Sequence, residues 1–240
     1  MDKASLEQWL QKLETLHPKA IELGLERVAD VANRLQLLPV VQPVVSVGGT
    51  NGKGSTVAVL EALLKEAGYS TGVFTSPHLL RFNERIRVAG VDVADKEITD
   101  AFVAIDEARS AISLTYFEFA TLAALLIFKN RAPDVVVLEV GLGGRLDAVN
   151  IVNPTVAVIT SIDLDHQSWL GETRGEIARE KAGIMRSGIP VVIAEQDPPH
   201  ELLQCVTEVA ATPALYLGRE FTVAVAHGQW QAVLQQADGR

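Results

Sequence analysis

Hydrophobic residues recur at the start of the chain with the spacing of two amphipathic helices. Over residues 6–16, leucines and a tryptophan lie three or four positions apart, with charged and amide side chains between them. His17-Pro18 ends this stripe, and a second helical stripe follows Gly24. The pattern therefore predicts an N-terminal helical segment over residues 1–40.

From Pro43 onward, short β-branched runs alternate with helical stretches. The expected strands cover residues 44–47, 72–74, 134–140, 155–162 and 190–194, and the expected helices cover 55–67, 96–111, 117–129, 173–186 and 199–210. Near-continuous Val and Ile runs separated by helices are typical of a parallel sheet that is covered on both faces. The pattern predicts an α/β fold with a mostly parallel sheet.

The end of the chain breaks this alternation. Two apolar runs, 221–226 and 230–234, flank His227-Gly228-Gln229 and predict a small C-terminal β-hairpin, followed by polar residues. We found no internal repeat or long linker. We therefore expect residues 1–240 to form one domain, with residues 213–240 as a strand and hairpin extension.

The composition is that of an ordinary globular protein, with 48% hydrophobic and 21% charged residues among 240. The single cysteine, Cys205, excludes an internal disulfide and fits a reducing compartment. The first residues do not resemble a signal peptide, and no apolar run approaches the ~18 residues of a membrane span. We expect a cytoplasmic monomer without a membrane partner.

The formal net charge is −9, from 21 Lys and Arg against 30 Asp and Glu. This charge repels polyanions at long range, so we expect no nucleic-acid partner. Any phosphate must then be bound by a local arrangement of backbone amides, lysine and metal ions.

A glycine-rich loop follows the first expected strand and leads into the helix expected over 55–67. Glycines allow backbone amides to surround an anion, the helix N-terminus is electropositive, and a lysine and hydroxyls can reach the outer phosphates and magnesium. The spacing is not that of a standard P-loop, because Val47 replaces the first glycine. We predict a nucleotide-phosphate site; the alternative is a glycine-rich turn with a solvated lysine. The residues of the loop are Gly49, Thr50, Asn51, Gly52, Lys53, Gly54 and Ser55.

Two further candidates follow expected strands. Glu139 ends a buried run, where a carboxylate must be paired or coordinated, so it is either a magnesium ligand or part of a salt bridge. His166 follows the strand 155–162 and is either a metal ligand or a structural hydrogen-bonding group. The carboxyl ends of parallel strands share one rim of the sheet. We therefore expect loop 48–54, Glu139 and His166 to converge.

Lys181 shares the inward stripe of the expected helix 173–186 with Ile177 and Ile184. Lysine is almost never buried without a partner. Its position leaves two interpretations open: a functional amine, or an apolar stem that carries its ammonium to the surface.

Six segments stand in order along the chain: GTNGKGST (49–56), TSPHLLRFNERIRV (75–88), SLTYFEFATLAAL (113–125), LEVGLGGRLDAVN (138–150), TSIDLDHQSWLG (160–171) and REKAGI (179–184). In sequence and spacing they closely resemble the bifunctional dihydrofolate synthase/folylpolyglutamate synthase family of bacteria, a relative of the Mur ligases. The resemblance runs from about Leu6 to the end of the chain. A match to six motifs in the same order identifies a family far more specifically than a match to any single motif.

The resemblance implies an ATP-dependent amide ligase with ATP and Mg²⁺ as cofactors. In that family, ATP phosphorylates a carboxylate of dihydropteroate, or the terminal glutamate of a folate. The amine of an incoming L-glutamate then attacks the acyl phosphate. ATP is needed because a carboxylate is a poor acyl donor at neutral pH until its oxygen becomes a phosphate leaving group.

The resemblance also assigns residues. Thr50 to Lys53 match the segment that holds the ATP phosphates, while Ser76, Glu139 and His166 match the magnesium ligands. Lys181 matches a carbamylated lysine, which the resemblance places in the catalytic centre together with Lys53 and His166. The positions that match pterin-binding segments are Leu23, Gly24, Leu25, Glu26, Thr115, Tyr116, Phe117, Glu118, Leu146, Asp147 and Ala148.

Two positions depart from the family pattern: Val149 stands where threonine is usual, and Asp163 stands where a small residue is commoner. Residues 1–240 also do not include the second, C-terminal α/β domain of these ligases. We therefore expect the ATP-binding half of such an enzyme, able to bind Mg-ATP and a pterin, with little or no ligase activity by itself.

Two alternatives remain. One is a catalytically silent nucleotide- or folate-binding remnant. The other is a different P-loop phosphotransferase, such as a kinase or GTPase, which is disfavoured because the loop departs from GxxxxGK[ST] and no Asn-Lys-x-Asp segment is present.

Overall fold

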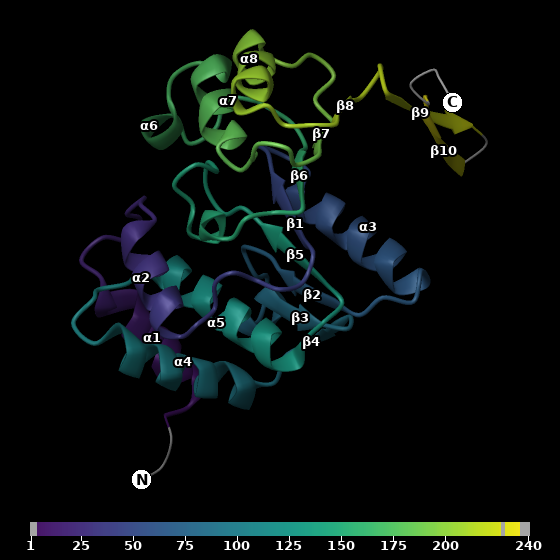
Figure 1. Cartoon of the computed structure of the whole chain (residues 1–240). Coiled ribbons are helices and arrows are strands. Elements are labelled where there is room, and N and C mark those ends of the chain that lie inside the picture. The colour runs from purple at the N-terminus through teal and green to yellow at the C-terminus, as the bar shows by residue number, and fades with distance from the viewer. Residues whose placement is uncertain (1–3, 227–228, 236–240) are drawn as a thin grey trace.

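The computed structural model describes residues 4–226 and 229–235, and these form an eight-stranded sheet with helices packed against it (Figure 1). The strand order is β4-β3-β2-β5-β1-β6-β7-β8. The strands from β2 to β8 in this order run parallel, whereas β3 and β4 pair antiparallel at one edge. Their bounds are β1 (Val44–Gly48), β2 (Thr71–Phe74), β3 (Ile86–Val88), β4 (Val91–Asp92), β5 (Val135–Glu139), β6 (Val156–Ile159), β7 (Val191–Ile193) and β8 (Ala214–Tyr216).

Helix α3 (Lys53–Glu66) packs against one face of the sheet, where Val57 joins Val47, Val73 and Val137 in a small core. The opposite face carries the main core, which contains most of α5 (Tyr116–Arg131). The α/β prediction with helices on both faces is therefore confirmed. The other helices that contribute to the main core are α1 (Leu6–Leu16), α2 (Glu26–Arg34), α4 (Asp95–Arg109), α6 (Gln167–Leu170), α7 (Arg174–Ala182) and α8 (His200–Val209).

The predicted N-terminal helices pack on α4 and α5. Trp9 of α1 lies 5.8 Å from Phe102 of α4 and 6.4 Å from Phe119 of α5, measured between ring centroids. Ser5 begins α1 with a capping box to Gln8, which explains why the helix starts where the apolar stripe starts. No helix in residues 4–226 or 229–235 is both long and apolar enough to cross a membrane.

The alternation of side chains along β5 determines which face of the sheet the Glu139 side chain is on. Val136 and Leu138 contribute to the main core, whereas Val137 faces α3. Side chains two positions apart on a strand share a face. Glu139 therefore points toward the α3 side, at the carboxyl end of the strand.

Some boundaries differ from the predicted ones. Strand β6 ends at Ile159 rather than at residue 162, because the following residues leave the sheet and contact the glycine-rich loop. Helix α7 ends at Ala182 rather than at 186, with Gly183 as its cap. The short strands β3 and β4 were not predicted, since two or three residues carry too little periodicity.

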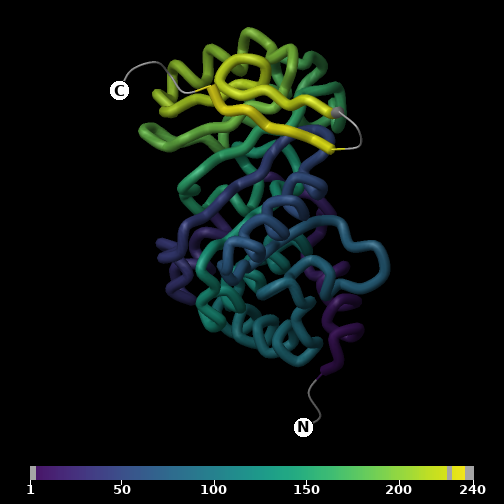
Figure 2. Tube along the Cα trace, turned by 90° about the vertical axis from the view of Figure 1, so that its right-hand side faces the viewer, coloured from purple at the N-terminus to yellow at the C-terminus, as the bar shows by residue number. Residues whose placement is uncertain are grey.

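The predicted C-terminal hairpin is confirmed. Strands β9 (Phe221–Ala226) and β10 (Gln229–Leu234) form a separate two-stranded sheet, at the opposite end of the molecule from α1 (Figure 2). Gln229, expected in the turn, belongs to β10. The other turn residues, 227–228, and the polar tail 236–240 lie outside the described residues.

Candidate nucleotide and substrate site

The glycine-rich loop connects β1 to a helix that begins without a side-chain cap. Gly52 precedes α3 in the left-handed region, at φ +80°, and the first turn of α3 carries no acidic residue. By contrast, α1, α5 and α7 begin with a Ser or Thr side chain that accepts a backbone N–H. The amides that open α3 are therefore available to a bound anion.

The segment after β6 holds the loop in shape. Thr160 Oγ1 donates to the carbonyl of Asn51 at 2.7 Å, and Thr50 N donates to the carbonyl of Ser161 at 2.8 Å. At Gly49, a Cβ atom would lie 1.8 Å from Thr160 Oγ1, and φ is +148°. Glycine is required at this position both for the backbone conformation and for the close approach of Thr160.

Two lysines lie against the loop. Lys53 Nζ donates to the carbonyls of Gly49 at 3.1 Å and Thr50 at 3.2 Å. Lys181 Nζ donates to the same Gly49 carbonyl at 2.9 Å, and only 4% of Lys181 is exposed. Burial, with a smaller contribution from the charge of Lys53, lowers the pKa of Lys181 from 10.5 to about 8. The amine is inside the protein, so the structure does not support the interpretation in which the stem carries the ammonium to the surface.

Glu139 and Ser76 lie beside the loop. Ser76 N, just beyond β2, donates to Glu139 Oε2 at 3.1 Å. A Cβ atom at Gly54 would lie 3.8 Å and 3.9 Å from the two carboxylate oxygens. Burial raises the pKa of Glu139, opposed by the Ser76 hydrogen bond and by the charge of Lys53. Within the described residues Glu139 forms no ion pair, so the salt-bridge alternative is not what the structure shows.

His166 reaches the same rim of the sheet from the loop that follows β6. It has φ +48° and directly precedes the short helix α6, and 54% of its side chain is exposed. Its Nε2 atom lies 3.6 Å from Asp165 Oδ2. No group of three or more His, Cys, Asp or Glu side chains suited to a metal ion occurs in the described part of the chain. A divalent ion beside Glu139 would therefore also need hydroxyl or ligand oxygens.

A cavity of about 420 Å³ opens between these residues and the start of α5. It is large enough for a small organic ligand. The predicted residues that line it are Leu23, Lys53, Ser76, Phe117, Glu118, Asp147, Ala148 and His166. The lining residues without a predicted role are Ala20, Ile21, Pro77, Arg85, Gly141 and Leu142.

Other predicted substrate residues lie outside this cavity. A neighbouring hollow contains Gly24, Leu25, Glu26 and Leu146, together with Leu23 and Arg27. Thr115 caps α5, and Tyr116 packs edge-on against Phe82 with ring centroids 6.0 Å apart. The structure thus brings Ala20 and Ile21 to the cavity wall in place of residues 24–26.

Asp147 is the most deeply buried carboxyl group of the cavity, with 2% of the residue exposed. Burial raises its pKa to about 6, opposed by hydrogen bonds from backbone amides that include Leu142 N at 2.8 Å and Val149 N at 3.0 Å. A group with this pKa changes its protonation state near neutral pH.

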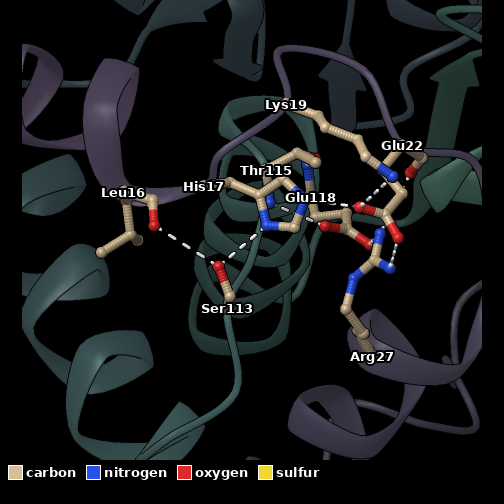
Figure 3. A network of polar contacts seen from close by, with 8 residues as sticks. All are labelled: Leu16, His17, Lys19, Glu22, Arg27, Ser113, Thr115 and Glu118. Atoms are coloured by element: carbon tan, nitrogen blue, oxygen red, sulfur yellow. Dashed lines mark hydrogen bonds and ion pairs between the residues drawn. The ribbon is translucent and has the colours of Figure 1, made fainter.

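A polar network joins the cavity wall to α5 (Figure 3). His17 Nε2 and Arg27 Nη1 contact the two carboxylate oxygens of Glu22 at 2.8 Å and 2.9 Å. Arg27 Nη2 donates to Glu118 Oε1 at 3.2 Å, and Glu118 Oε2 accepts from Thr115 N at 2.7 Å. The segment that contains Ala20 and Ile21 is therefore tied to the first turn of α5.

The two departures from the family pattern lie away from the cavity. Val149 is 1% exposed and packs in the main core. Asp163 exchanges hydrogen bonds with the Thr50 hydroxyl through its backbone, and its carboxylate accepts from Leu164 N at 2.8 Å. Neither side chain lines the cavity.

Comparison with known proteins gives a consistent result. Residues 47–223 match the model of the Mur ligase middle domain. The chain is 53% identical over 206 residues to the dihydrofolate synthase/folylpolyglutamate synthase of Escherichia coli. This match covers 86% of this chain and 49% of the E. coli protein. The chain thus spans about half the length of the curated relatives that it matches.

Solved structures agree with this similarity. E. coli FolC in complex with DHPP and ADP superposes with a TM-score of 0.94 at 49% identity, over 96% of this chain and 56% of that one. A bifunctional folylpolyglutamate synthase/dihydrofolate synthase with Mn, AMPPNP and L-glutamate bound gives a TM-score of 0.90 at 47% identity, over 97% and 56%. The chain therefore belongs to the family of the Mur ligase middle domain, as its six motifs predict.

Proposed function

We propose that residues 1–240 form the ATP-binding part of a ligase that joins L-glutamate to dihydropteroate and to folates. The similarity to dihydrofolate synthase/folylpolyglutamate synthases supports this reaction, as do the nucleotides, DHPP and L-glutamate named in the related structures. The reaction proceeds through phosphorylation of the acceptor carboxylate by ATP and attack by the glutamate amine. The chain spans only about half the length of its relatives, so the proposal concerns the part of the reaction that these residues carry out, the binding of ATP and of the acceptor.

The observation that carries the proposal is the uncapped start of α3 behind the glycine-rich loop, with Lys53 at its first position. Free amides and a lysine at a helix N-terminus bind phosphate oxygens. On this proposal, Lys53 exchanges its bonds to the Gly49 and Thr50 carbonyls for the charged phosphates of ATP.

The residues also fit a divalent ion. Glu139 is a buried carboxylate without an ion-pair partner in the described part of the chain, and it lies beside Ser76 and the loop. Carboxylate and hydroxyl oxygens are the ligands that Mg²⁺ prefers. We propose Glu139, Ser76 and His166 as its ligands. A bound Mg²⁺ would neutralise charge on the transferred phosphoryl group.

We also propose that Lys181 reacts with carbon dioxide to form a carbamate, with loss of one proton from the amine. The lowered pKa of Lys181 supports this step, because only the neutral amine is nucleophilic. Intact-protein and peptide mass spectrometry at neutral pH in bicarbonate should show the mass of one carbon dioxide on Lys181. An unmodified Lys181 under these conditions would contradict the assignment.

The cavity suits the acceptor. Phe117, Leu142 and Ile21 supply apolar wall for a flat heterocycle, and Asp147 supplies a buried polar group. This supports a pterin at the Asp147 end and the reacting carboxylate near Lys53 and Ser76.

The test is Mg-ATP binding by the chain, followed by turnover with dihydropteroate and L-glutamate. Lys53→Ala removes a charged donor to the phosphates, so we expect ATP affinity to fall about 10- to 100-fold by calorimetry. The matched control is Lys65→Ala, which removes the same charge from the exposed last turn of α3 and should leave affinity unchanged. Equal affinity in wild type and Lys53→Ala would overturn the phosphate site.

Turnover then separates the alternatives. Amide formation supports a ligase, whereas nucleotide binding without amide formation supports the silent remnant. Phosphoryl transfer to a hydroxyl substrate would instead indicate a kinase.

A further inference from the structure

Arg85 stands out among the half-buried arginines because, within the described residues, its guanidinium has neither a carboxylate nor any oxygen acceptor. Arg186 also lacks a carboxylate partner, but it donates to backbone and amide oxygens. Arg27, Arg87 and Arg109 each contact a carboxylate within 3.2 Å. The Arg85 guanidinium has a single hydrogen bond within the described residues, from Nε to His78 Nδ1 at 2.8 Å, and forms no ion pair there. A partly desolvated cation without a counter-ion is costly, which is a reason to look for an external anion.

The position of Arg85 is nevertheless well defined. Its Cζ atom lies 5.5 Å from the ring centroid of Tyr116 and 5.8 Å from that of Phe82. These two rings pack edge-on against each other, and Phe82 is buried. The guanidinium is thus held by contacts with two aromatic rings and by His78 at Nε. Such a group loses little entropy when it binds a ligand.

His78 acts as the acceptor in this arrangement. Its Nδ1 atom accepts from Arg85 Nε at 2.8 Å, because an imidazole nitrogen without a proton is a hydrogen-bond acceptor. This leaves the N–H groups on both terminal nitrogens of Arg85 without a protein acceptor in the described part of the chain.

These free donors belong to a residue that lines the cavity described above. Arg85, Lys53 and Ser76 are all part of its lining, and Arg85 is close enough to Glu139 for their charges to interact. The phosphates of the nucleotide already have their own donors at the start of α3. An anion of the acceptor is therefore the group that remains for Arg85 to bind.

We propose that Arg85 binds the carboxylate of the acceptor substrate through its two terminal nitrogens and holds it beside the phosphate site. This proposal rests on the proposed function, because it assumes an acceptor whose carboxylate is activated by ATP. A planar guanidinium matches both oxygens of a carboxylate, whereas a lysine offers only a point charge.

The test compares two ligands that differ in this group alone: dihydropteroate and its primary carboxamide. Binding of each is measured by fluorescence titration to wild type, Arg85→Lys and Arg85→Met. We expect wild type to favour the acid about 10- to 100-fold. Arg85→Met should bind the two ligands equally, and Arg85→Lys should keep a smaller preference. Affinity for Mg-ATP should stay within about twofold in both variants, since the nucleotide has its own donors.

The matched control is Arg87→Lys, two residues along the same segment. The Arg87 guanidinium donates to Glu61 and does not line the cavity, so this variant should keep the wild-type preference for the acid. Melting temperatures of all variants identify any loss of folding.

Three results would overturn the proposal for Arg85 while leaving the proposed function intact. The first is an undiminished preference for the acid in Arg85→Met. The second is an equal loss of affinity for both ligands in Arg85→Met, which would indicate a purely structural role for Arg85. The third is a loss of Mg-ATP affinity in Arg85→Met, which would assign Arg85 to the nucleotide. If wild type binds Mg-ATP but neither pterin ligand, the failure lies in the proposed acceptor, and the Arg85 assignment falls with it.

Discussion

Lys181 shows how one buried amine depends on its surroundings. Among the described residues its ammonium has one hydrogen-bond acceptor, the carbonyl of Gly49, and Lys53 adds a second positive charge nearby. Both the missing solvation and the like charge favour the neutral amine. The folded chain therefore holds a proton on Lys181 less tightly than the unfolded chain does.

This difference predicts a pH-dependent stability. Above the ordinary pKa of 10.5 the amine is neutral in both states; as pH falls toward about 8, the unfolded chain takes up the proton first and the folded state loses stability. In buffers kept free of carbon dioxide, so that Lys181 stays an unmodified amine, wild type should gain about 2 kcal/mol of unfolding free energy relative to Lys181→Met between pH 7 and pH 9.5. Urea unfolding of both proteins at the two pH values measures this, and a constant difference would contradict the lowered pKa.

At the scale of elements, the cavity wall depends on a short connection between α1 and α2. The segment that contains Ala20 and Ile21 has no secondary structure of its own, and the network of Figure 3 attaches it to α5. Glu118 is central, because one of its oxygens closes the capping box and the other accepts from Arg27. The Arg27 Nε atom is buried without a hydrogen-bond partner, so the guanidinium is partly desolvated.

Removal of Arg27 should therefore cost stability. The side chain of Glu118 is only 3% exposed, so Arg27→Met leaves a buried carboxylate without its cation. We expect the free energy of unfolding, measured with urea, to fall by about 2 kcal/mol. This value is below that for a fully buried ion pair because Arg27 is partly exposed. In Arg27→Met/Glu118→Gln the loss should be smaller than the sum of the single losses, since no charge remains unpaired. Additive losses would show that the pair is not coupled.

The control for this cycle is Arg34→Met. Arg34 pairs with Asp30 on the surface of α2, with 42% and 52% of the two side chains exposed. An exposed pair contributes little, so stability should change by less than about 0.5 kcal/mol. A loss equal to that of Arg27→Met would mean that the packing of α2, and not the buried pair, accounts for both effects.

At the scale of the whole molecule, the main sheet and the hairpin differ in how completely they are covered. The central strands are buried on both faces, whereas the hairpin exposes an apolar face formed by Val223, Val225, Trp230 and Leu234. Exposed apolar surface of this kind contributes nothing to the stability of the sheet. It is also a site at which copies of a chain can associate.

Polar substitution on the hairpin should therefore be tolerated. Val225 and Trp230 are 77% and 64% exposed, so Val225→Lys/Trp230→Lys should change the unfolding free energy by less than about 0.5 kcal/mol. It should also lower light scattering at high protein concentration. A loss of stability well above this value would show that the face is covered in solution.

Prediction from the sequence succeeded where the chemistry is local. The loop 49–55, the strands 44–47 and 134–140 and the two N-terminal helices follow from glycine placement and hydrophobic periodicity within a few residues. The predicted convergence of the loop 48–54, Glu139 and His166 also agrees with the rule for parallel strands, because Lys53 and His166 line one cavity and Gly54 lies beside Glu139.

Prediction fell short where a residue acts through distant contacts. Arg85 lies within the quoted motif 75–88, but only the folded chain shows that its terminal nitrogens have no protein acceptor and face a cavity. Residues 24–26, which were predicted to bind substrate, lie in a neighbouring hollow, whereas Ala20 and Ile21, which had no predicted role, line the cavity. Which side of an irregular segment faces a cavity depends on packing with α5 and not on periodicity.

The sequence by itself determined the α/β alternation, the glycine-rich loop and the acid that ends β5, because backbone conformation and side-chain alternation are local properties. Only the tertiary structure decided which of the charged groups are left without partners. Pairing depends on groups far apart in the chain: Lys181 meets Gly49, Arg27 meets Glu118, and Arg85 meets no carboxylate among the described residues.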